Sequence, residues 1–302
     1  MNIIVAGGSG FIGGHLVKVL LEKGRRVTVL TRGGGAVPPG AESSFWDGRE
    51  AGAWEEALGS CDALVNISGA GVADRPWTQA RRRILTDSRL ESTRALVDAL
   101  GRAPKRPAVF VNASAVGIYG EGGERELTEE SPRGSGFLAD LCARWEAEAA
   151  RAQSLGVRSV HLRLGVVLGR GGGALARMLL PFKLGLGGRL GDGRQFMPWV
   201  HAADAVGLAL AAVENAAYRG PVNAVAPEAA TNAEFTAALG RALGRPTLFP
   251  VPAFALKLAL GKMSELLLGS QKVRPAAALK AGYKFVFPRL DEALADIVMI
   301  RE

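Results

Sequence analysis

The chain has few residues of the types on which several protein classes depend. Its 302 residues include two cysteines and three histidines, and aromatic residues make up only 6%. Two cysteines cannot form a disulfide framework, and no His/Cys cluster has metal-ligand spacing. No run of about 18 apolar residues is present, and no charged segment precedes an apolar core at the N-terminus. We therefore expect a cytoplasmic protein without a metal, disulfides or a membrane partner.

The chain is basic, with 37 Lys and Arg against 29 Asp and Glu and a formal net charge of +8. Such a balance is typical of nucleic-acid-binding proteins, but here the arginines are spread along the sequence. The one dense run, Arg81-Arg82-Arg83, fits a solvated helix face better than a groove-reading element. We expect no nucleic-acid partner, because attraction of an anionic cofactor or substrate is sufficient to explain the charge.

A glycine-rich loop near the N-terminus is the most informative feature. Gly7, Gly10 and Gly13 have GxxGxxG spacing, between an apolar run at residues 3–5 and an amphipathic stretch at residues 11–23. This order predicts a strand, a phosphate-binding turn and a helix, whose first N–H groups suit a pyrophosphate. The alternative is a glycine-rich turn without a ligand, in a chain with 40 glycines. The predicted dinucleotide contacts are Gly7, Ser9, Gly10, Phe11, Ile12 and Gly13.

The end of the second predicted strand, at residues 26–32, indicates which dinucleotide binds. NAD sites usually place an Asp or Glu there to accept a hydrogen bond from the ribose 2′-hydroxyl. This chain has Thr31 and Arg32 instead. A guanidinium offers charge-assisted hydrogen bonds to the 2′-phosphate of NADP, which a carboxylate would repel. The residues favour NADP(H), although Arg32 could also be a solvated arginine at a strand end.

Strands and helices alternate through the first half of the chain. This alternation predicts a doubly wound parallel α/β sheet of the Rossmann type. The expected strands lie at residues 3–5, 26–32, 63–67, 107–112 and 157–163, and the expected helices at 11–23, 79–100 and 136–154. Past residue 168, glycine-dense loops surround helical stretches. We predict a cofactor-binding domain at 1–168, to which 200–226 returns, and a smaller, mostly helical lobe at 169–302 that caps the substrate.

Several blocks of the sequence resemble the extended short-chain dehydrogenase/reductase family, which includes nucleotide-sugar epimerases and related reductases. The loop at residues 7–13 matches that family's cofactor loop, and residues 66–70 match its segment beside the cofactor. Ser114 and Tyr119 match its serine and tyrosine-glycine elements. Residues 162–173, 198–201, 223–227 and 271–275 are similar to an atypical branch, described only as epimerase family proteins, whose C-terminal domain has no assigned function.

The resemblance implies further site residues. Cofactor contacts are expected at Ile67, Ser68, Gly69, Arg89 and Val167, with Arg89 in place of an asparagine that the family often has near the phosphates. Substrate contacts are expected at Arg194, Trp199 and His201, with His201 more readily an orienting or capping residue than a base. Arg75, Trp77, Gln195 and Phe196 could complete an anion-binding pocket. The helices at 79–100 and 136–154 imply a possible homodimer.

One departure from the family affects the chemistry. The family relies on a Tyr-x-x-x-Lys pair, in which the ammonium lowers the pKa of the phenol. No such pair occurs in this chain, and the best alignment places Leu138 and Cys142 at those positions. Tyr119 could donate a proton if an arginine lowered its pKa. The alternative is a tyrosine buried and hydrogen-bonded at the sheet edge, and Cys142 fits a core thiol better than a reactive one.

Two functions from different classes follow. The first is an NADP(H)-dependent oxidoreductase that acts on a small carbonyl, hydroxyl or sugar-like compound, with Ser114 and Tyr119 as candidate catalytic residues. The second is a non-catalytic NADP(H)-binding protein whose cofactor state regulates a partner. The missing pair favours the second function, while the retained serine and tyrosine and the C-terminal lobe favour the first. A sugar epimerase is less favoured, because epimerisation needs a proton to be removed and returned.

Overall fold

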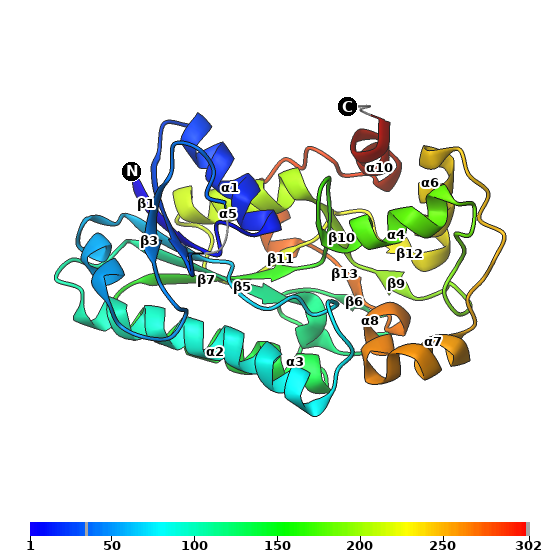
Figure 1. Ribbon diagram of the computed structural model, residues 1–302, viewed down its shortest axis with the longest axis horizontal. Coiled ribbons are helices and arrows are strands. Elements are labelled where there is room, and N and C mark those ends of the chain that lie inside the picture. Colours follow the sequence, from blue (N-terminus) through cyan, green and yellow to red (C-terminus); the bar gives the residue numbers. More distant parts are fainter. Residues whose placement is uncertain (34–35, 300–302) are drawn as a thin grey trace.

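Seven parallel strands form the centre of the protein in the computed structural model, which describes residues 1–33 and 36–299 (Figure 1). Their order across the sheet is β11-β7-β5-β4-β1-β2-β3. The chain builds outward from β1 in both directions, so the strand order reverses between β1 and β4, where open α/β sheets bind ligands. The strands are β1 (Asn2–Ala6), β2 (Arg26–Thr31), β3 (Glu42–Phe45), β4 (Ala63–Asn66), β5 (Val109–Ala115), β7 (Arg158–Leu164) and β11 (Gly220–Ala224).

Helices cover both faces of the sheet, α1 and α5 on one side and α2 and α3 on the other (Figure 1). Successive residues of a strand point to opposite faces. Accordingly Val5 packs in one core cluster with Leu16 of α1, and Ile4 packs in another with Leu96 of α2. These helices are α1 (Phe11–Glu22), α2 (Gln79–Arg102), α3 (Phe137–Ala150) and α5 (Ala202–Glu214).

The C-terminal lobe is mostly helical and has its own core. Its helices are α4 (Gly173–Lys183), α6 (Asn232–Leu243), α7 (Ala253–Leu260), α8 (Glu265–Leu268) and α10 (Leu290–Met299). The helix α9 (Ala276–Lys280) instead packs against β11 in a core cluster of the sheet domain. Two short strand pairs join the lobe to the sheet domain: β6 (Glu126–Leu127) with β13 (Lys272–Val273), and β8 (Val166–Leu168) with β10 (Trp199–His201). A third pair, β9 (Phe196–Met197) with β12 (Ala230–Thr231), lies within the lobe. Within residues 1–33 and 36–299, no helix is both long and apolar enough to cross a membrane.

The predicted fold class, a Rossmann-type parallel sheet with a helical C-terminal lobe, is confirmed. The edge strand β3 was not predicted, because Glu42-Ser43-Ser44-Phe45 is largely exposed and carries no apolar alternation. Within residues 200–226, α5 packs against α1 and β11 pairs with β7, so this segment lies in the sheet domain. The division at residue 168 stays a prediction.

Candidate cofactor site

The loop between β1 and α1 has a geometry that requires glycine at two positions. Gly7 has a φ of +85°, and a Cβ there would lie 2.8 Å from the carbonyl carbon of Ile67. A Cβ on Gly13 would lie 2.1 Å from the carbonyl oxygen of Gly7. The loop therefore packs backbone against backbone, on the end of β4 and on the first turn of α1, while Ser9 and Gly10 remain exposed.

The N-terminus of α1 is free to bind an anion. Gly10 occupies the N-cap position, no side chain caps the helix, and its first turn contains no acidic residue. The first N–H groups of a helix lack intrahelical partners, and the helix dipole favours negative charge at this end. The uncapped helix end beside a close-packed glycine loop fits the pyrophosphate of a dinucleotide.

Arg32 follows β2 at the same edge of the sheet. β1 and β2 pair in parallel from Asn2 with Arg26 to Ala6 with Leu30, so Arg32 emerges next to the glycine loop. The side chain is exposed, and in the described part of the chain no carboxylate lies within ion-pair distance of it. This guanidinium is therefore available for a phosphate on the adenosine ribose.

Arg89 is a second arginine without a carboxylate partner among residues 1–33 and 36–299. It lies on α2, donates to the Leu85 carbonyl oxygen at 3.1 Å, and its guanidinium carbon lies 5.2 Å from the ring centre of Trp145. That carbon would be 3.3 Å from a Cβ on Gly69, just beyond β4. Burial lowers the pKa of the Arg89 guanidinium. A partly buried cation at the carboxyl end of β4 suits a phosphate group.

Buried amides fix the segment after β4. The Ser68 hydroxyl donates to Asn66 Oδ1 at 2.5 Å, and Asn66 Nδ2 donates to Asn112 Oδ1 at 2.7 Å. Asn66 Nδ2 also donates to the Thr93 hydroxyl at 3.2 Å, which accepts from Trp145 Nε1 at 2.8 Å. These bonds tie the ends of β4 and β5 to α2 and α3, so Ser68 stays in place beside the glycine loop.

An apolar cluster joins the glycine loop to the C-terminal lobe. Phe11 and Ile12 pack with Val167, Val200 and Ala202. The Phe11 ring also covers the glycines at residues 169–173, where a Cβ on any of three of them would lie within 3.1 Å of the ring. The structure thus brings together three of the predicted cofactor residues, Phe11, Ile12 and Val167, in one apolar cluster beside the loop.

Ser114 and Tyr119 belong to a buried polar network. Ser114 donates to the Glu146 carboxylate at 2.6 Å, and Arg163 donates to both oxygens of that carboxylate at 2.8 and 2.9 Å. Arg163 Nη1 also donates to the Tyr119 hydroxyl at 2.8 Å, and this hydroxyl donates to Asn223 Oδ1 at 2.7 Å. The donor and an acceptor position of the Tyr119 hydroxyl are therefore both used within the protein.

Burial raises the pKa of Tyr119, although the charge and hydrogen bond of Arg163 act in the opposite direction. The side chain is only 1% exposed. The prediction of a proton donor required an arginine that lowers the pKa of the phenol. Arg163 is present, but the pKa of Tyr119 is raised because burial outweighs the arginine. These contacts match the alternative, a tyrosine buried and hydrogen-bonded at the sheet edge.

The helix face that carries the family's tyrosine and lysine has a different character here. Leu138 packs with Trp77 and Leu141, and burial raises the pKa of the Cys142 thiol to about 12. Glu146, one turn further along α3, is bound by Arg163. The role of Glu146 was missed from the sequence, although its spacing of four residues from Cys142 was the available signal.

The three predicted substrate residues lie in different environments. Trp199 is 1% exposed and donates to the Glu228 carbonyl oxygen, which makes it a core residue. His201 caps α5 by accepting from the Ala203 N–H at 3.1 Å, as the capping interpretation expects, and burial lowers its pKa. Arg194 lies on the surface, on the rim of a hollow of about 380 Å³, 3.4 Å from Glu124. The contacts of Trp199 and His201 are structural and do not point to a substrate.

The remaining predicted pocket residues are also dispersed. The Gln195 amide donates to the Leu190 and Leu267 carbonyl oxygens. The Lys272 ammonium lies over the Phe196 ring, 5.3 Å from its centre, on the rim of the same hollow. Trp77 is buried, and Arg75 is exposed on the loop before α2.

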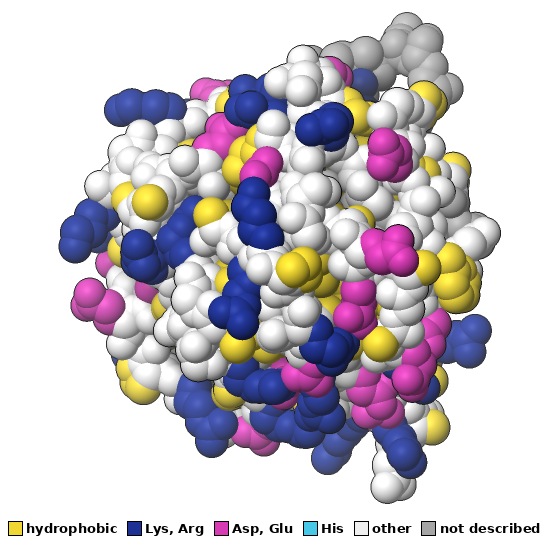
Figure 2. Space-filling view, turned by 90° about the vertical axis from the view of Figure 1, so that its left-hand side faces the viewer, with side chains coloured by type: hydrophobic (Ala, Val, Ile, Leu, Met, Phe, Trp, Pro, Cys, Tyr) yellow, Lys and Arg dark blue, Asp and Glu magenta, His cyan; other side chains and the backbone are white. Residues whose placement is uncertain are grey.

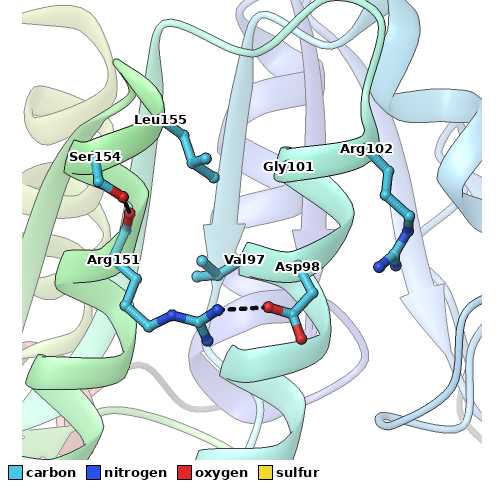
Figure 3. Close-up of a pocket in the computed structure, with 7 residues that line it drawn as sticks. All are labelled: Val97, Asp98, Gly101, Arg102, Arg151, Ser154 and Leu155. Atoms are coloured by element: carbon cyan, nitrogen blue, oxygen red, sulfur yellow. Dashed lines mark hydrogen bonds and ion pairs between the residues drawn. The ribbon is translucent and has the colours of Figure 1, made fainter.

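A second hollow of about 290 Å³ lies between the C-terminal end of α2 and the segment that follows α3 (Figure 3). Arg151 is paired with Asp98 at 2.7 Å, and Arg102 is paired with Glu55 at 2.8 Å. The hollow lies where β5 and β7 begin, at the edge of the sheet opposite the glycine loop. Its charges are neutralised within the protein, so it carries no sign of a cofactor site.

Comparison with known proteins identifies the family of the chain. The model of the NAD dependent epimerase/dehydratase family matches residues 3–224, and a domain of unknown function, DUF1731, matches residues 251–297. Epimerase family protein SDR39U1 of Homo sapiens is 41% identical over 302 residues, covering 99% of this chain and 100% of that protein. Epimerase family protein YfhF of Bacillus subtilis is 35% identical, covering 100% of this chain and 99% of that protein. A crystal structure of the human protein, isoform 2, with NADPH has a TM-score of 0.88 and 38% identity, covering 99% of both chains.

Proposed function

Because the chain belongs to the NAD dependent epimerase/dehydratase family, we propose that it binds NADP(H) and is an oxidoreductase of a small carbonyl, hydroxyl or sugar-like compound. The observation that carries the cofactor assignment is the Arg32 guanidinium, which has no ion-pair partner among the described residues and follows β2 beside the glycine loop and the uncapped N-terminus of α1. A similar chain, the human protein, was crystallised with NADPH, which supports the choice of dinucleotide.

Bound NADPH would supply a hydride to a carbonyl carbon. The residues of this chain would hold the cofactor: Arg32 the 2′-phosphate, the loop at 7–13 the pyrophosphate, and Arg89 a phosphate oxygen from the other side. The apolar cluster of Phe11, Ile12 and Val167 would exclude water from the cofactor. Because Tyr119 is satisfied internally, the proton that completes a reduction would come from solvent or from the substrate itself.

A second candidate function is favoured by a specific observation. Leu138 and Cys142 replace the family's proton relay, and Tyr119 is buried. Glu146, one turn further along this helix face, is held by Ser114 and Arg163, so no side chain of this face is free to act as the relay. A protein with an intact cofactor loop and no relay could report NADP(H) occupancy to a partner. The same observation weighs against a sugar epimerase.

The two candidates separate in one experiment. NADPH is titrated by its fluorescence, and a panel of aldehydes, ketones and keto-sugars is then screened for loss of nicotinamide absorbance. Gly13→Ala, which disrupts the loop, and Gly14→Ala, which leaves it intact, are the matched controls against contaminating reductases. Turnover in the wild type and Gly14→Ala but not in Gly13→Ala supports an oxidoreductase. Tight binding without turnover on any compound supports the regulatory protein.

A further inference from the structure

The exposed large apolar side chains gather on the C-terminal lobe. Of the twelve such side chains in the described residues, seven lie at residues 180–186 and 248–258. Phe254 and Leu258, one turn apart on α7, are 73% and 87% exposed. We name this surface the lobe face. It consists of Leu180, Leu184, Leu186, Leu248, Phe249, Phe254 and Leu258.

The helix α7 leaves much of its apolar surface exposed, with Ala253, Ala255, Leu256 and Leu260 half-buried and its other residues exposed. Seven of its eight residues are apolar, yet none of them is buried. It packs mainly on the 3₁₀ turn Gly261–Ser264 that follows it. A helix that is apolar on nearly all sides is ordinarily covered, and contiguous exposed apolar surface marks an interaction site.

The two segments of the lobe face are held side by side. The Val251 N–H donates to the Arg189 carbonyl oxygen, and the Gly191 N–H donates to the Val251 carbonyl oxygen, both at 2.9 Å. This pairing brings the chain after α4 alongside the chain before α7, and both lie at the right-hand end of the molecule in Figure 1. The two segments therefore lie at one end of the protein, with α4 above and α7 below in Figure 1.

The charged side chains within the two segments of the lobe face are all basic, and the exposed Asp192 and Glu265 follow directly after these segments. Residues 173–191 and 244–264 contain no Asp or Glu. Arg177 pairs with Asp74 at 2.7 Å, and the other five cations are exposed and form no ion pair in the part of the chain that the structure describes. The opposite end of the molecule differs, because basic and acidic side chains are interspersed there (Figure 2). The six cations of these segments are Arg177, Lys183, Arg189, Arg245, Lys257 and Lys262.

From this combination we propose that the lobe face docks on an anionic phospholipid surface. Phe and Leu side chains on a short helix insert at the boundary between headgroups and acyl chains, and flanking Lys and Arg bind anionic headgroups. A second copy of the chain fits less well, since two such faces would bring like charges together. The sequence-based prediction of no membrane partner rested on the lack of a spanning segment, and peripheral docking needs none.

Flotation with lipid vesicles tests the proposal on the full-length protein. One set of vesicles contains about 30% phosphatidylglycerol in phosphatidylcholine, and the other is phosphatidylcholine alone. We expect binding to the anionic vesicles that weakens with salt. Phe254→Ser/Leu258→Ser and Lys257→Glu/Lys262→Glu should each reduce this binding by on the order of tenfold.

Matched controls substitute residues away from the lobe face. Ile84→Ser removes an exposed apolar side chain on α2, and Lys105→Glu reverses an exposed charge after α2. Both should bind vesicles as the wild type does, and NADPH titration confirms that every variant is folded. The proposal is overturned if the anionic vesicles do not bind the protein, or if the lobe-face variants bind like the controls. It is also overturned if sedimentation shows a dimer that only the lobe-face substitutions dissociate, which would assign the face to a second copy.

Discussion

The guanidinium of Arg163 donates to the hydroxyl of Tyr119 at 2.8 Å and also lies over its ring, 5.1 Å from the centre. The same guanidinium is bound to Glu146, whose hydrogen bonds and charge hold the pKa of Arg163 above its usual value despite burial. A cation that is already neutralised by a carboxylate has little charge left to ionise a phenol. The pair therefore fastens the end of β5 to β7 and α3.

Tyr119→Phe should destabilise the protein rather than remove an activity. It leaves Arg163 Nη1 and Asn223 Oδ1 without their buried partner, at a cost of about 1–3 kcal/mol in the free energy of unfolding. Tyr218→Phe is the control, because that buried tyrosine forms no hydroxyl hydrogen bond in the described residues. Urea denaturation and NADPH titration of both variants measure the effect. An unchanged stability together with abolished turnover would instead identify Tyr119 as a proton donor.

Gly13→Ala and Gly14→Ala, adjacent substitutions in α1, should behave differently. The new Cβ at residue 13 would meet the Gly7 carbonyl oxygen at 2.1 Å, whereas the one at residue 14 would lie 3.7 Å from the Gly8 carbonyl oxygen. We expect Gly13→Ala to lose most NADPH binding because the loop must move. Gly14→Ala should bind normally and gain up to about 1 kcal/mol from helix propensity. Equal affinities in the two variants would contradict the close-packed loop.

Arg89→Met should weaken NADPH and NADH alike, by roughly tenfold or more, since both cofactors carry the pyrophosphate. Methionine keeps an apolar chain over Trp145, and removing a partly buried unpaired charge should not lower stability. Arg94→Met is the control on the same helix, at an exposed arginine 3.6 Å from Glu148. A loss of affinity for NADPH alone, or no loss of affinity for either cofactor, would contradict a contact between Arg89 and the pyrophosphate.

Stability should fall in alkali through Cys142. Burial raises the pKa of this thiol from 9.0 to about 12. Between these values the folded protein keeps a proton that the unfolded chain releases, so the stabilisation is complete below the lower value and is lost as the pH rises through the upper one. Urea midpoints at about pH 8 and about pH 10.5 should differ less in Cys142→Ala than in the wild type. An identical difference would show that the thiol is not protected.

Periodicity and glycine spacing were sufficient to predict the sheet, its main helices and the glycine loop, because these depend on local pattern. The edge strand β3 could not be predicted, since its pairing with β2 is tertiary and its residues are polar and exposed. Trp199 and His201 lie in a motif shared with the family, and sequence alone could not show that their side chains turn into the core and the cap of α5. The spacing of Glu146 from Cys142 could place its carboxylate on that face of α3, but its pairing with Arg163 on β7 is a tertiary contact that the sequence does not show.

The possible homodimer through α2 and α3 stays a prediction. The exposed faces of these helices carry ion pairs, among them Arg83 with Asp87 and Arg94 with Glu148, and Ile84 is the one large apolar side chain on α2 or α3 that is exposed in the described structure. An obligate dimer would bury a more apolar surface. Light scattering gives the mass in solution.

The central claim is that Arg32 binds the 2′-phosphate of NADP(H). It is tested most directly by the ratio of NADPH to NADH affinity in the wild type, Arg32→Ala and Arg26→Ala. Arg26 is the control because it is exposed at the far end of the same strand, where it donates to Asn2. Loss of a charge-assisted phosphate contact predicts that Arg32→Ala lowers the ratio by about tenfold to a hundredfold while NADH affinity holds. Arg26→Ala should leave both affinities unchanged. An equal loss for both cofactors in Arg32→Ala, or none, would contradict the assignment of the 2′-phosphate site.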